Sequence, residues 1–177
     1  MSAVLEVWNT LPAAEAETEI RACCGSRTWS NAMVKLRPVG DRSTLLNAAD
    51  EVWQNLDEED WREAFLSHPR IGESRVEAVA AWPLPVRSAN WSEAEQSRVA
   101  AGALADDTLK TALAEANREY EAKFGHIFIV CASGKGGPEI LKILRSRLVN
   151  DPASELREAA EQQRQITRLR LEKWLAE

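Results

Sequence analysis

Apolar residues recur at intervals of three and four along most of the chain, the spacing that places them on one face of an α-helix. Capping residues, glycines and prolines stand where these periodic stretches begin and end. The pattern predicts helices over the approximate ranges 12–24, 28–36, 44–56, 57–68, 92–105, 107–124, 138–150 and 152–174. We therefore expect an all-α, single-domain bundle of about eight helices that covers residues 1–177.

Side chains suited to helix N-caps stand before several of these stretches. We expect Thr44, Asp57 and either Asp106 or Asp107 to cap the helices that they precede. Their short oxygen-bearing side chains accept hydrogen bonds from the first backbone amides of a helix, which have no partner inside the helix. These residues therefore predict where three of the helices begin.

The stretch Ser92–Gln96 reads SEAEQ and has the spacing of a capping box, in which Ser92 and Glu95 each bond the other's backbone amide. It predicts a helix N-terminus at Ser92, preceded by a loop over residues 73–91. Gln96 adds a third polar side chain to the same turn. Because the first backbone amides of a helix have no partner inside the helix, such an N-terminus can also bind a polar or anionic ligand.

One stretch departs from the helical spacing. His126–Ala132 reads HIFIVCA and, taken alone, is typical of a β-strand. No other run in the chain is of similar quality, so a strand here would lack a partner. We therefore expect an extended, buried segment between two helices, whose backbone amides and carbonyls are free to face a ligand.

The composition is that of a soluble globular protein, since 45% of the residues are hydrophobic and 28% are charged. The formal net charge of −6 argues against a nucleic-acid-binding protein, whose affinity rests on clustered Lys and Arg. No apolar run approaches the roughly 20 residues that a bilayer crossing needs. The first residues also lack the pattern of a secretory signal. We therefore expect a cytoplasmic protein with neither a membrane nor a nucleic-acid partner.

The three cysteines and two histidines do not form a disulfide framework or a convincing zinc site, so we expect reduced, buried thiols. Residues 133–137 read SGKGG but lack the glycine and Ser/Thr positions of a phosphate-binding loop. We interpret them as a solvated turn before Pro138. Cys131 lies in an apolar stretch, which raises a thiol pKa, so it is a weak candidate for a nucleophile.

The pentapeptide His68-Pro69-Arg70-Ile71-Gly72 places one of the two histidines where an amphipathic helix must stop. Proline disfavours the helical conformation of the residue before it, and glycine adds backbone freedom just beyond. His68 is therefore expected at a helix end. Two interpretations stay open: the ring caps the helix by meeting its last carbonyls, or it carries out proton chemistry at the mouth of a site.

The predicted last helix carries one stripe of inward-facing positions. Its members are Leu156, Ala160, Gln163, Thr167, Leu171 and Trp174. Arg170 also falls in this stripe, whereas Arg157, Arg164 and Arg168 lie on the flank, where solvent is expected. Because a buried guanidinium is costly unless it is paired, Arg170 is either one half of an internal salt bridge or a clamp for a carboxylate or carbonyl group.

Three stretches in this order and spacing, His68–Gly72, Ser92–Gln96 and the run FGHIFIVCASGK over residues 124–135, resemble the 2-oxo-4-hydroxy-4-carboxy-5-ureidoimidazoline (OHCU) decarboxylases of urate catabolism. Further agreement comes from CCGS over 23–26 with Trp29, DWREAF over 60–65 and ITRLRL over 166–171. The resemblance covers nearly the whole chain. Each motif is modest alone, but several in register are hard to obtain by chance.

The resemblance implies an all-helical enzyme, usually a homodimer, that converts the small molecule OHCU to (S)-allantoin without a metal or an organic cofactor. It places the catalytic roles on His68, Glu95 and Arg170. The residues that it assigns to substrate binding are Pro69, Ser92, Gln96 and the backbone of Phe128, Ile129, Val130, Cys131 and Ala132. The second histidine, His126, is expected to be structural.

Such a reaction needs no electron-sink cofactor if the conjugated ring of the substrate accepts the electron pair. Arg170 would anchor an oxygen, Glu95 would hold ring or ureido nitrogens, and His68 would control protonation of the vacated carbon. One alternative is a noncatalytic helical module that retains the pocket, and the joint presence of these three residues argues against it. Another is an enzyme that acts on a neighbouring ureide such as allantoin, and the lack of convincing metal ligands argues against that.

Overall fold

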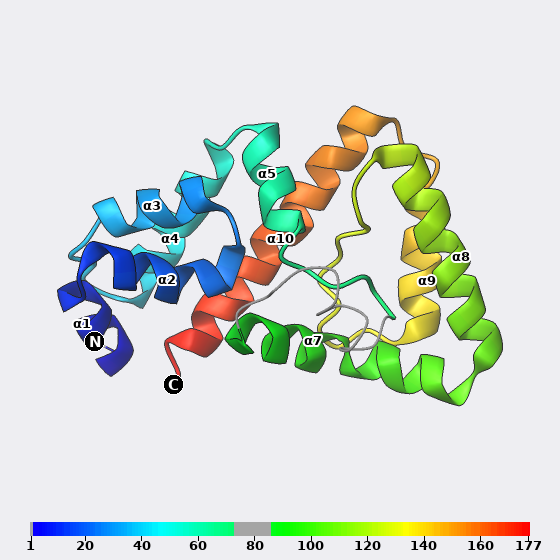
Figure 1. Ribbon diagram of the computed structural model, residues 1–177, viewed down its shortest axis with the longest axis horizontal. Coiled ribbons are helices and arrows are strands. Elements are labelled where there is room, and N and C mark those ends of the chain that lie inside the picture. Colours follow the sequence, from blue (N-terminus) through cyan, green and yellow to red (C-terminus); the bar gives the residue numbers. More distant parts are fainter. Residues whose placement is uncertain (1, 73–85) are drawn as a thin grey trace. The chain divides into compact units, whose positions relative to one another are not determined.

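The computed structural model describes residues 2–72 and 86–177, and these contain nine α-helices and no strand (Figure 1). This confirms the predicted all-α fold. The chain forms two compact units, one of residues 1–64 with 163–177 and one of residues 65–162. The assignment of one domain to residues 1–177 stays a prediction.

The first unit contains α1 to α4, most of α5 and the C-terminal part of α10. The bounds of these helices are α1 Ala3–Thr10, α2 Ala13–Cys24, α3 Arg27–Lys35, α4 Arg42–Gln54, α5 Glu58–Phe65 and α10 Pro152–Trp174. Helix α1 was not predicted from the sequence. Only Leu5 and Trp8 of its eight residues are buried, which is too few for a clear periodic pattern.

Tryptophan side chains tie the first unit together. The Nε1 atom of Trp8 donates a hydrogen bond of 2.9 Å to the carbonyl of Ala16, and that of Trp29 donates one of 3.2 Å to the carbonyl of Ala49. The Trp8 ring also meets the Trp174 ring edge-on, with 5.8 Å between the centroids. Each buried indole thus fills core volume while its N–H finds an acceptor, which links α1 to α2, α3 to α4, and α1 to α10.

The second unit contains α7 (Val86–Ala105), α8 (Asp107–Phe124), α9 (Gly137–Arg147), the N-terminal part of α10 and an extended segment between α8 and α9. Residues 127–132 form neither helix nor strand and run as an extended chain between α8 and α9 (Figure 1), and residues 128–132 are buried, as the sequence predicted. One apolar cluster joins α7, α8, α9 and the extended segment to Ile71. Its buried members are Ile71, Val99, Ala103, Leu109, Leu113, Ala116, Tyr120, Phe124, Phe128, Val130, Ala132, Ile140 and Leu144.

Two of the predicted caps are confirmed and one is wrong. Asp57 Oδ1 accepts hydrogen bonds from the first amides of α5, and Asp106 caps α8 in the same way. The cap of α4 is Asp41 rather than Thr44. Helix α4 begins at Arg42, and the Thr44 amide donates to Asp41 Oδ1 at 2.7 Å, so Thr44 is the residue bonded by the cap.

The predicted start of the helix at Ser92 is also wrong. Helix α7 already begins at Val86, so Ser92 lies inside it and there is no capping box or free helix N-terminus at this position. Ser88, Ala89 and Ser92 are all buried, at the same three- and four-residue spacing as Val99 further along the helix. Tertiary burial of this face therefore outweighs the local turn preference of the serines. The rest of the predicted loop, residues 73–85, lies outside the described residues.

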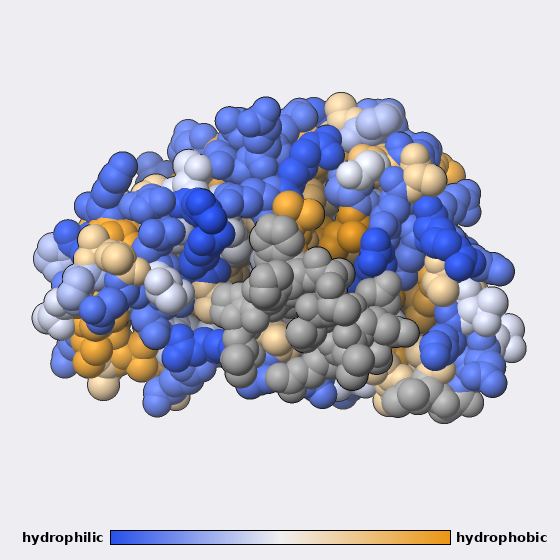
Figure 2. Space-filling view, viewed as in Figure 1, coloured by the Kyte–Doolittle hydropathy of each residue, from blue (hydrophilic) through white to orange (hydrophobic). Residues whose placement is uncertain are grey.

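Hydrophilic side chains cover most of the described surface seen in Figure 2. The large apolar side chains that are exposed are scattered along the sequence, and those in the described residues are Val7, Leu36, Leu66 and Val149. No helix in the described ranges combines the length and the apolar composition that a bilayer crossing requires.

Candidate active site

His68 lies just after the end of α5, as the sequence predicted, although the helix ends three residues earlier than expected. Helix α5 stops at Phe65, and the His68 amide donates a 3.1 Å hydrogen bond to the Phe65 carbonyl in the following turn. The side chain is half-buried and its Nε2 atom is shielded from solvent. The imidazole is therefore held at a helix end in a partly dry environment.

The residues that follow His68 are fixed to α8 by polar contacts. Arg70 meets both carboxylate oxygens of Glu121, with Nε–Oε1 at 2.5 Å and Nη2–Oε2 at 2.9 Å. The buried Asn117 donates a hydrogen bond of 3.0 Å from Nδ2 to the carbonyl of Ile71. Gly72 has φ of +86°, a conformation that favours glycine. Side-chain contacts from one helix therefore set the path of the chain beyond His68.

The predicted polar residues on α7 lie on its inner face. Ser92 is buried, while Glu95 and Gln96 are half-buried, and Val99 one turn later belongs to the apolar cluster of the second unit. Gln96 Oε1 accepts a hydrogen bond of 3.4 Å from the Gly72 amide. This contact brings the predicted SEAEQ motif beside the residues that follow His68.

The extended segment is held by side chains on one of its sides. The Arg147 Nη1 donates a hydrogen bond of 2.7 Å to the carbonyl of Ile129. Gln162 Oε1 accepts one of 2.9 Å from the Cys131 amide, and the Lys135 Nζ donates one of 2.8 Å to the Cys131 carbonyl. The Ile129 carbonyl and both backbone groups of Cys131 are thus engaged within the protein.

Val130 stands between these two anchored residues. In an extended chain the backbone groups of successive residues point to opposite sides, so the N–H and C=O of Val130 face away from Arg147 and Gln162. Its side chain is buried, and neither backbone group bonds to any residue that the structure describes. Fewer backbone groups of the segment are therefore available to a ligand than expected, since the Ala132 carbonyl also accepts a hydrogen bond of 3.0 Å from the Lys135 amide. Val130 provides one donor and one acceptor.

Arg170 belongs to the first unit and is fully buried on α10. Every predicted member of the inward stripe is buried as well, which confirms that stripe. The buried Cys24 thiol hydrogen-bonds the Thr167 side chain and lies within the electrostatic influence of the guanidinium. Burial raises the pKa of the Cys24 thiol to about 12, although the Ser26 backbone, the Thr167 side chain and the Arg170 charge oppose that rise. The thiol is therefore neutral at physiological pH.

Two of the flanking arginines are less solvated than the sequence predicted. Arg164 and Arg168 each donate to a different carboxylate oxygen of Asp50, both at 2.9 Å, whereas Arg157 is exposed as expected. Asp50 lies on α4, so this three-residue network holds the C-terminal part of α10 against α4. The flank of the last helix therefore carries a structural role in addition to its contact with solvent.

A cavity of about 410 Å³ opens between α8 and the segment after His68, in the second unit. Its described lining includes Arg70, Gly72, Lys110, Asn117, Arg118 and Glu121, but neither His68 nor Glu95. This cavity is therefore separate from the predicted catalytic residues. Within the residues that the structure describes, no group of three or more His, Cys, Asp or Glu side chains is placed to hold a metal ion.

The structure thus brings most of the predicted site residues into one unit. His68, Pro69, Ser92, Glu95, Gln96 and the segment 128–132 all belong to the second unit, and Arg170 belongs to the first. The convergence of Arg170 with His68 and Glu95 stays a prediction. Arg147 was not predicted from the sequence. Its position in one stripe with Ile140 and Leu144 was an available signal, because all three are buried on the same face of α9.

Comparisons with known proteins agree with these features. Residues 9–172 match the family described as OHCU decarboxylase. The chain is 35% identical over 157 residues to the uric acid degradation bifunctional protein TTL of Arabidopsis thaliana, a match that covers 89% of this chain and 46% of that protein. It is 41% identical over 56 residues to the 2-oxo-4-hydroxy-4-carboxy-5-ureidoimidazoline decarboxylase of Amia calva, covering 32% of each. The matched regions thus span less than half the length of either relative.

A solved structure shares the fold. The crystal structure of OHCU decarboxylase in the presence of (S)-allantoin matches with a TM-score of 0.72 and 33% sequence identity, covering 90% of this chain and 98% of that chain. The fold, the residue pattern and these matches define one family of proteins whose described structure is helical. The chain belongs to the OHCU decarboxylase family.

Proposed function

We propose that this chain catalyses the cofactor-free decarboxylation of OHCU to (S)-allantoin in urate degradation. The observation that carries the proposal is the likeness, at 33% identity over 90% of the chain, to an OHCU decarboxylase crystallised in the presence of (S)-allantoin. The names of the two curated relatives, for uric acid degradation and for OHCU decarboxylation, agree with it.

The chemistry sets what the protein must supply. The bond between the ring carbon and the carboxylate breaks, carbon dioxide leaves, and the electron pair passes into the conjugated ring of the substrate. A proton must then reach the vacated carbon from one face to give the (S) product. The protein therefore has to orient the substrate and to deliver one proton, and general acid catalysis of this kind is typically worth about 10² to 10⁴ in rate.

Each predicted residue has a role that fits its chemistry. His68 is suited to the proton transfer because an imidazole titrates near neutrality and its Nε2 atom is shielded from solvent. Glu95 and Gln96, on the half-buried face of α7, would hold the ring or ureido nitrogens. The N–H and C=O of Val130 would bind an amide-like edge of the substrate. Arg170 would anchor a carboxylate or carbonyl oxygen.

The test is to generate OHCU freshly from urate and to follow its decay with and without the protein by circular dichroism and chiral chromatography. We expect faster decay and formation of (S)-allantoin alone. Decay at the rate of buffer alone would overturn the proposal. Binding of (S)-allantoin without faster decay would instead indicate a noncatalytic module, and consumption of allantoin would indicate an enzyme of a neighbouring ureide.

We also propose that the protein is a homodimer, which the family resemblance supports, and that it acts in the cytoplasm. Light scattering coupled to size-exclusion chromatography should give about twice the 19.7 kDa mass of the chain. A mass equal to that of one chain across the micromolar range would contradict the dimer.

A further inference from the structure

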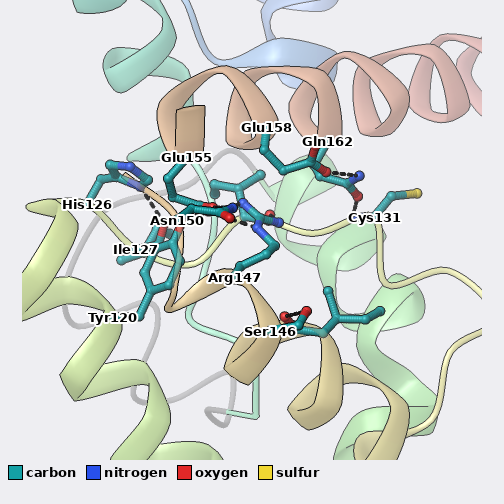
Figure 3. A network of polar contacts seen from close by, with 12 residues as sticks. Tyr120, His126, Ile127, Cys131, Ser146, Arg147, Asn150, Glu155, Glu158 and Gln162 are labelled. Carbon is teal, nitrogen blue, oxygen red and sulfur yellow. Dashed lines mark hydrogen bonds and ion pairs between the residues drawn. The ribbon is translucent and has the colours of Figure 1, made fainter. Parts of the chain in front are cut away.

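The extended segment between α8 and α9 lacks the usual means of fixing a backbone register. A strand in a sheet is held by a ladder of backbone hydrogen bonds, but residues 127–132 have no strand partner in the described structure. Its register is instead set by side chains that reach it from elsewhere. Arg147 on α9 bonds the Ile129 carbonyl. Gln162 on α10 bonds the Cys131 amide (Figure 3).

Arg147 is itself held rigidly. Glu155 is fully buried and accepts from Arg147 Nε at 2.8 Å, from Arg147 Nη2, and from the hydroxyl of Tyr120. Asn150 Nδ2 donates to the other oxygen of Glu155 at 2.8 Å. The guanidinium carbon lies 4.8 Å from the centroid of the Phe128 ring, a cation–π arrangement. With so many partners in a fixed geometry, the fork of Arg147 presents Nη1 to the Ile129 carbonyl in one orientation.

Gln162 is oriented by a second contact. Its Nε2 donates a hydrogen bond of 3.0 Å to Glu158 Oε1, one turn earlier on α10. The amide of Gln162 is therefore turned so that its Oε1 faces the Cys131 N–H at 2.9 Å. Glu158, Gln162 and Cys131 thus form a short chain of hydrogen bonds that ends on the extended segment.

From these contacts we propose that Arg147 and Gln162 are positioning residues for the reaction. By engaging Ile129 and Cys131 on one side of the segment, they present the N–H and C=O of Val130 on the other side, at the place where the substrate binds. This inference rests on the proposed function for its reaction, but the contacts that carry it lie wholly within the second unit. Neither side chain needs to touch the substrate, because each acts through the backbone.

The sharpest test exchanges the two ends of the Glu158–Gln162 contact. Gln162→Met removes the acceptor for the Cys131 amide. The double variant Gln162→Glu with Glu158→Gln restores it, because the new carboxylate at 162 accepts from both the Cys131 N–H and the amide at 158. Arg157→Met, at an exposed position of α10, is the matched control. Gln162→Asn, whose shorter amide withdraws from Cys131, repeats the test if Gln162→Met does not fold.

We expect Gln162→Met to raise KM about tenfold and to lower the enantiomeric purity of the allantoin, with a smaller change in kcat, because small displacements of a positioned substrate are costly. The exchanged pair should restore KM to within about threefold of the wild-type value, and Arg157→Met should change neither property. Arg147→Lys, which keeps the charge but loses the fork, should change KM in the same direction as Gln162→Met.

Hydrogen exchange of the Cys131 amide, measured by NMR without substrate, separates this inference from the proposed function. The amide should exchange faster in Gln162→Met and regain protection in the exchanged pair. An active wild-type protein with unchanged KM, product purity and Cys131 exchange in Gln162→Met would overturn the positioning role alone. A wild-type protein that does not accelerate OHCU decay would overturn the proposed function, whatever the exchange data show.

Discussion

The guanidinium of Arg70 and the carboxylate of Glu121 form a two-point ion pair, at 2.5 and 2.9 Å, between residues that lie 51 positions apart in the sequence. The pair ties the chain just beyond His68 to α8. Because α8 belongs to the apolar cluster of the second unit, the ion pair connects the predicted catalytic histidine to a rigid element.

Replacing Glu121 by Ala should therefore affect activity more than stability. Both side chains are partly exposed, at 40% for Arg70 and 26% for Glu121, so the expected loss in unfolding free energy is only about 0.2 to 1 kcal/mol. The factor by which kcat/KM falls should exceed the factor by which the unfolding equilibrium constant changes, because Arg70 lies only two residues after His68. Urea unfolding and turnover of fresh OHCU measure the two effects. Glu172→Ala, which breaks the exposed Arg42–Glu172 pair at 2.9 Å, is the control, and equal activities of the two variants would contradict the prediction.

His68→Ala should lower kcat by about 10² to 10⁴ while the helix content stays unchanged, because the proton donor is lost but no core side chain is. The matched variant is His126→Ala. The His126 ring packs 5.3 Å from the Phe65 ring and 5.5 Å from the Tyr120 ring, so its removal should reduce stability, by about 0.5 to 1.5 kcal/mol for each ring pair. Far-UV circular dichroism, thermal unfolding and turnover separate the two variants. Full activity of His68→Ala would remove His68 from the proposed role.

Arg170→Met should raise KM for OHCU by more than tenfold while the protein still folds, because methionine fills similar volume but cannot bind an oxygen. Arg168→Met on the same helix is the comparison. Arg168 is partly exposed and binds Asp50 at 2.9 Å, so its loss should cost stability without changing KM. Steady-state kinetics with chemical denaturation checks both. An unchanged KM in Arg170→Met would show that the buried guanidinium has only a structural role.

The Cys24 thiol should resist alkylation at pH 8 in the folded protein, because burial raises its pKa to about 12 and the thiolate is the reactive form. The raised pKa also makes stability depend on pH. The stabilising effect of the neutral thiol is fully present below the pKa of an unfolded cysteine, about 8.5, and is lost as the pH rises from there through about 12. Unfolding free energies of the wild type and Cys24→Ala should therefore converge over that interval. Labelling located by mass spectrometry checks the first part, and rapid modification of folded Cys24 at pH 8 would contradict it.

Acid should destabilise the protein partly through two helix caps. Backbone and side-chain hydrogen bonds from Thr44 lower the pKa of Asp41, and those from Ser154 lower the pKa of Asp151. A carboxyl whose pKa is lowered by folding stabilises the folded state at pH values above its unfolded pKa of about 3.9. This stabilisation is lost as the pH falls through the pKa of the folded state. Asp41→Asn and Asp151→Asn keep a capping oxygen, so their unfolding midpoints should fall less steeply than that of the wild type below about pH 4. Parallel slopes in all three proteins would contradict the prediction.

Local chemistry explains why so many helix ends were predictable. Gly25 and Gly125 end α2 and α8 with φ of 92° and 72°, a conformation that glycine adopts without strain. Asp57 caps the helix that follows it in the expected way. The start of α7 was not predictable by the same means. Ser92 has the sequence pattern of a cap, but it is buried together with Ser88 inside a helix that continues through it.

For buried charged side chains, too, the sequence predicted one part and the tertiary structure decided the other. The stripe on the last helix predicted that Arg170 faces inward, and the structure confirms it. The partners of a buried charge come from distant parts of the chain, however, and no periodicity names them. Arg147 lies in the stripe of α9, but its contact with Ile129 spans 18 residues, and the contact of Cys131 with Gln162 spans 31.

The sequence by itself determined that this protein is all-helical, that one apolar segment stays extended, and that it resembles the OHCU decarboxylases, because periodicity, caps and motifs are local properties. The tertiary structure alone decided which backbone groups of that segment are bonded and which remain available. The type of a residue does not indicate whether its backbone carbonyl or amide is hydrogen-bonded, because nearly all residue types have the same backbone groups. The contacts of Arg147, Gln162 and Lys135 with Ile129 and Cys131 distinguish Val130 from its two neighbours.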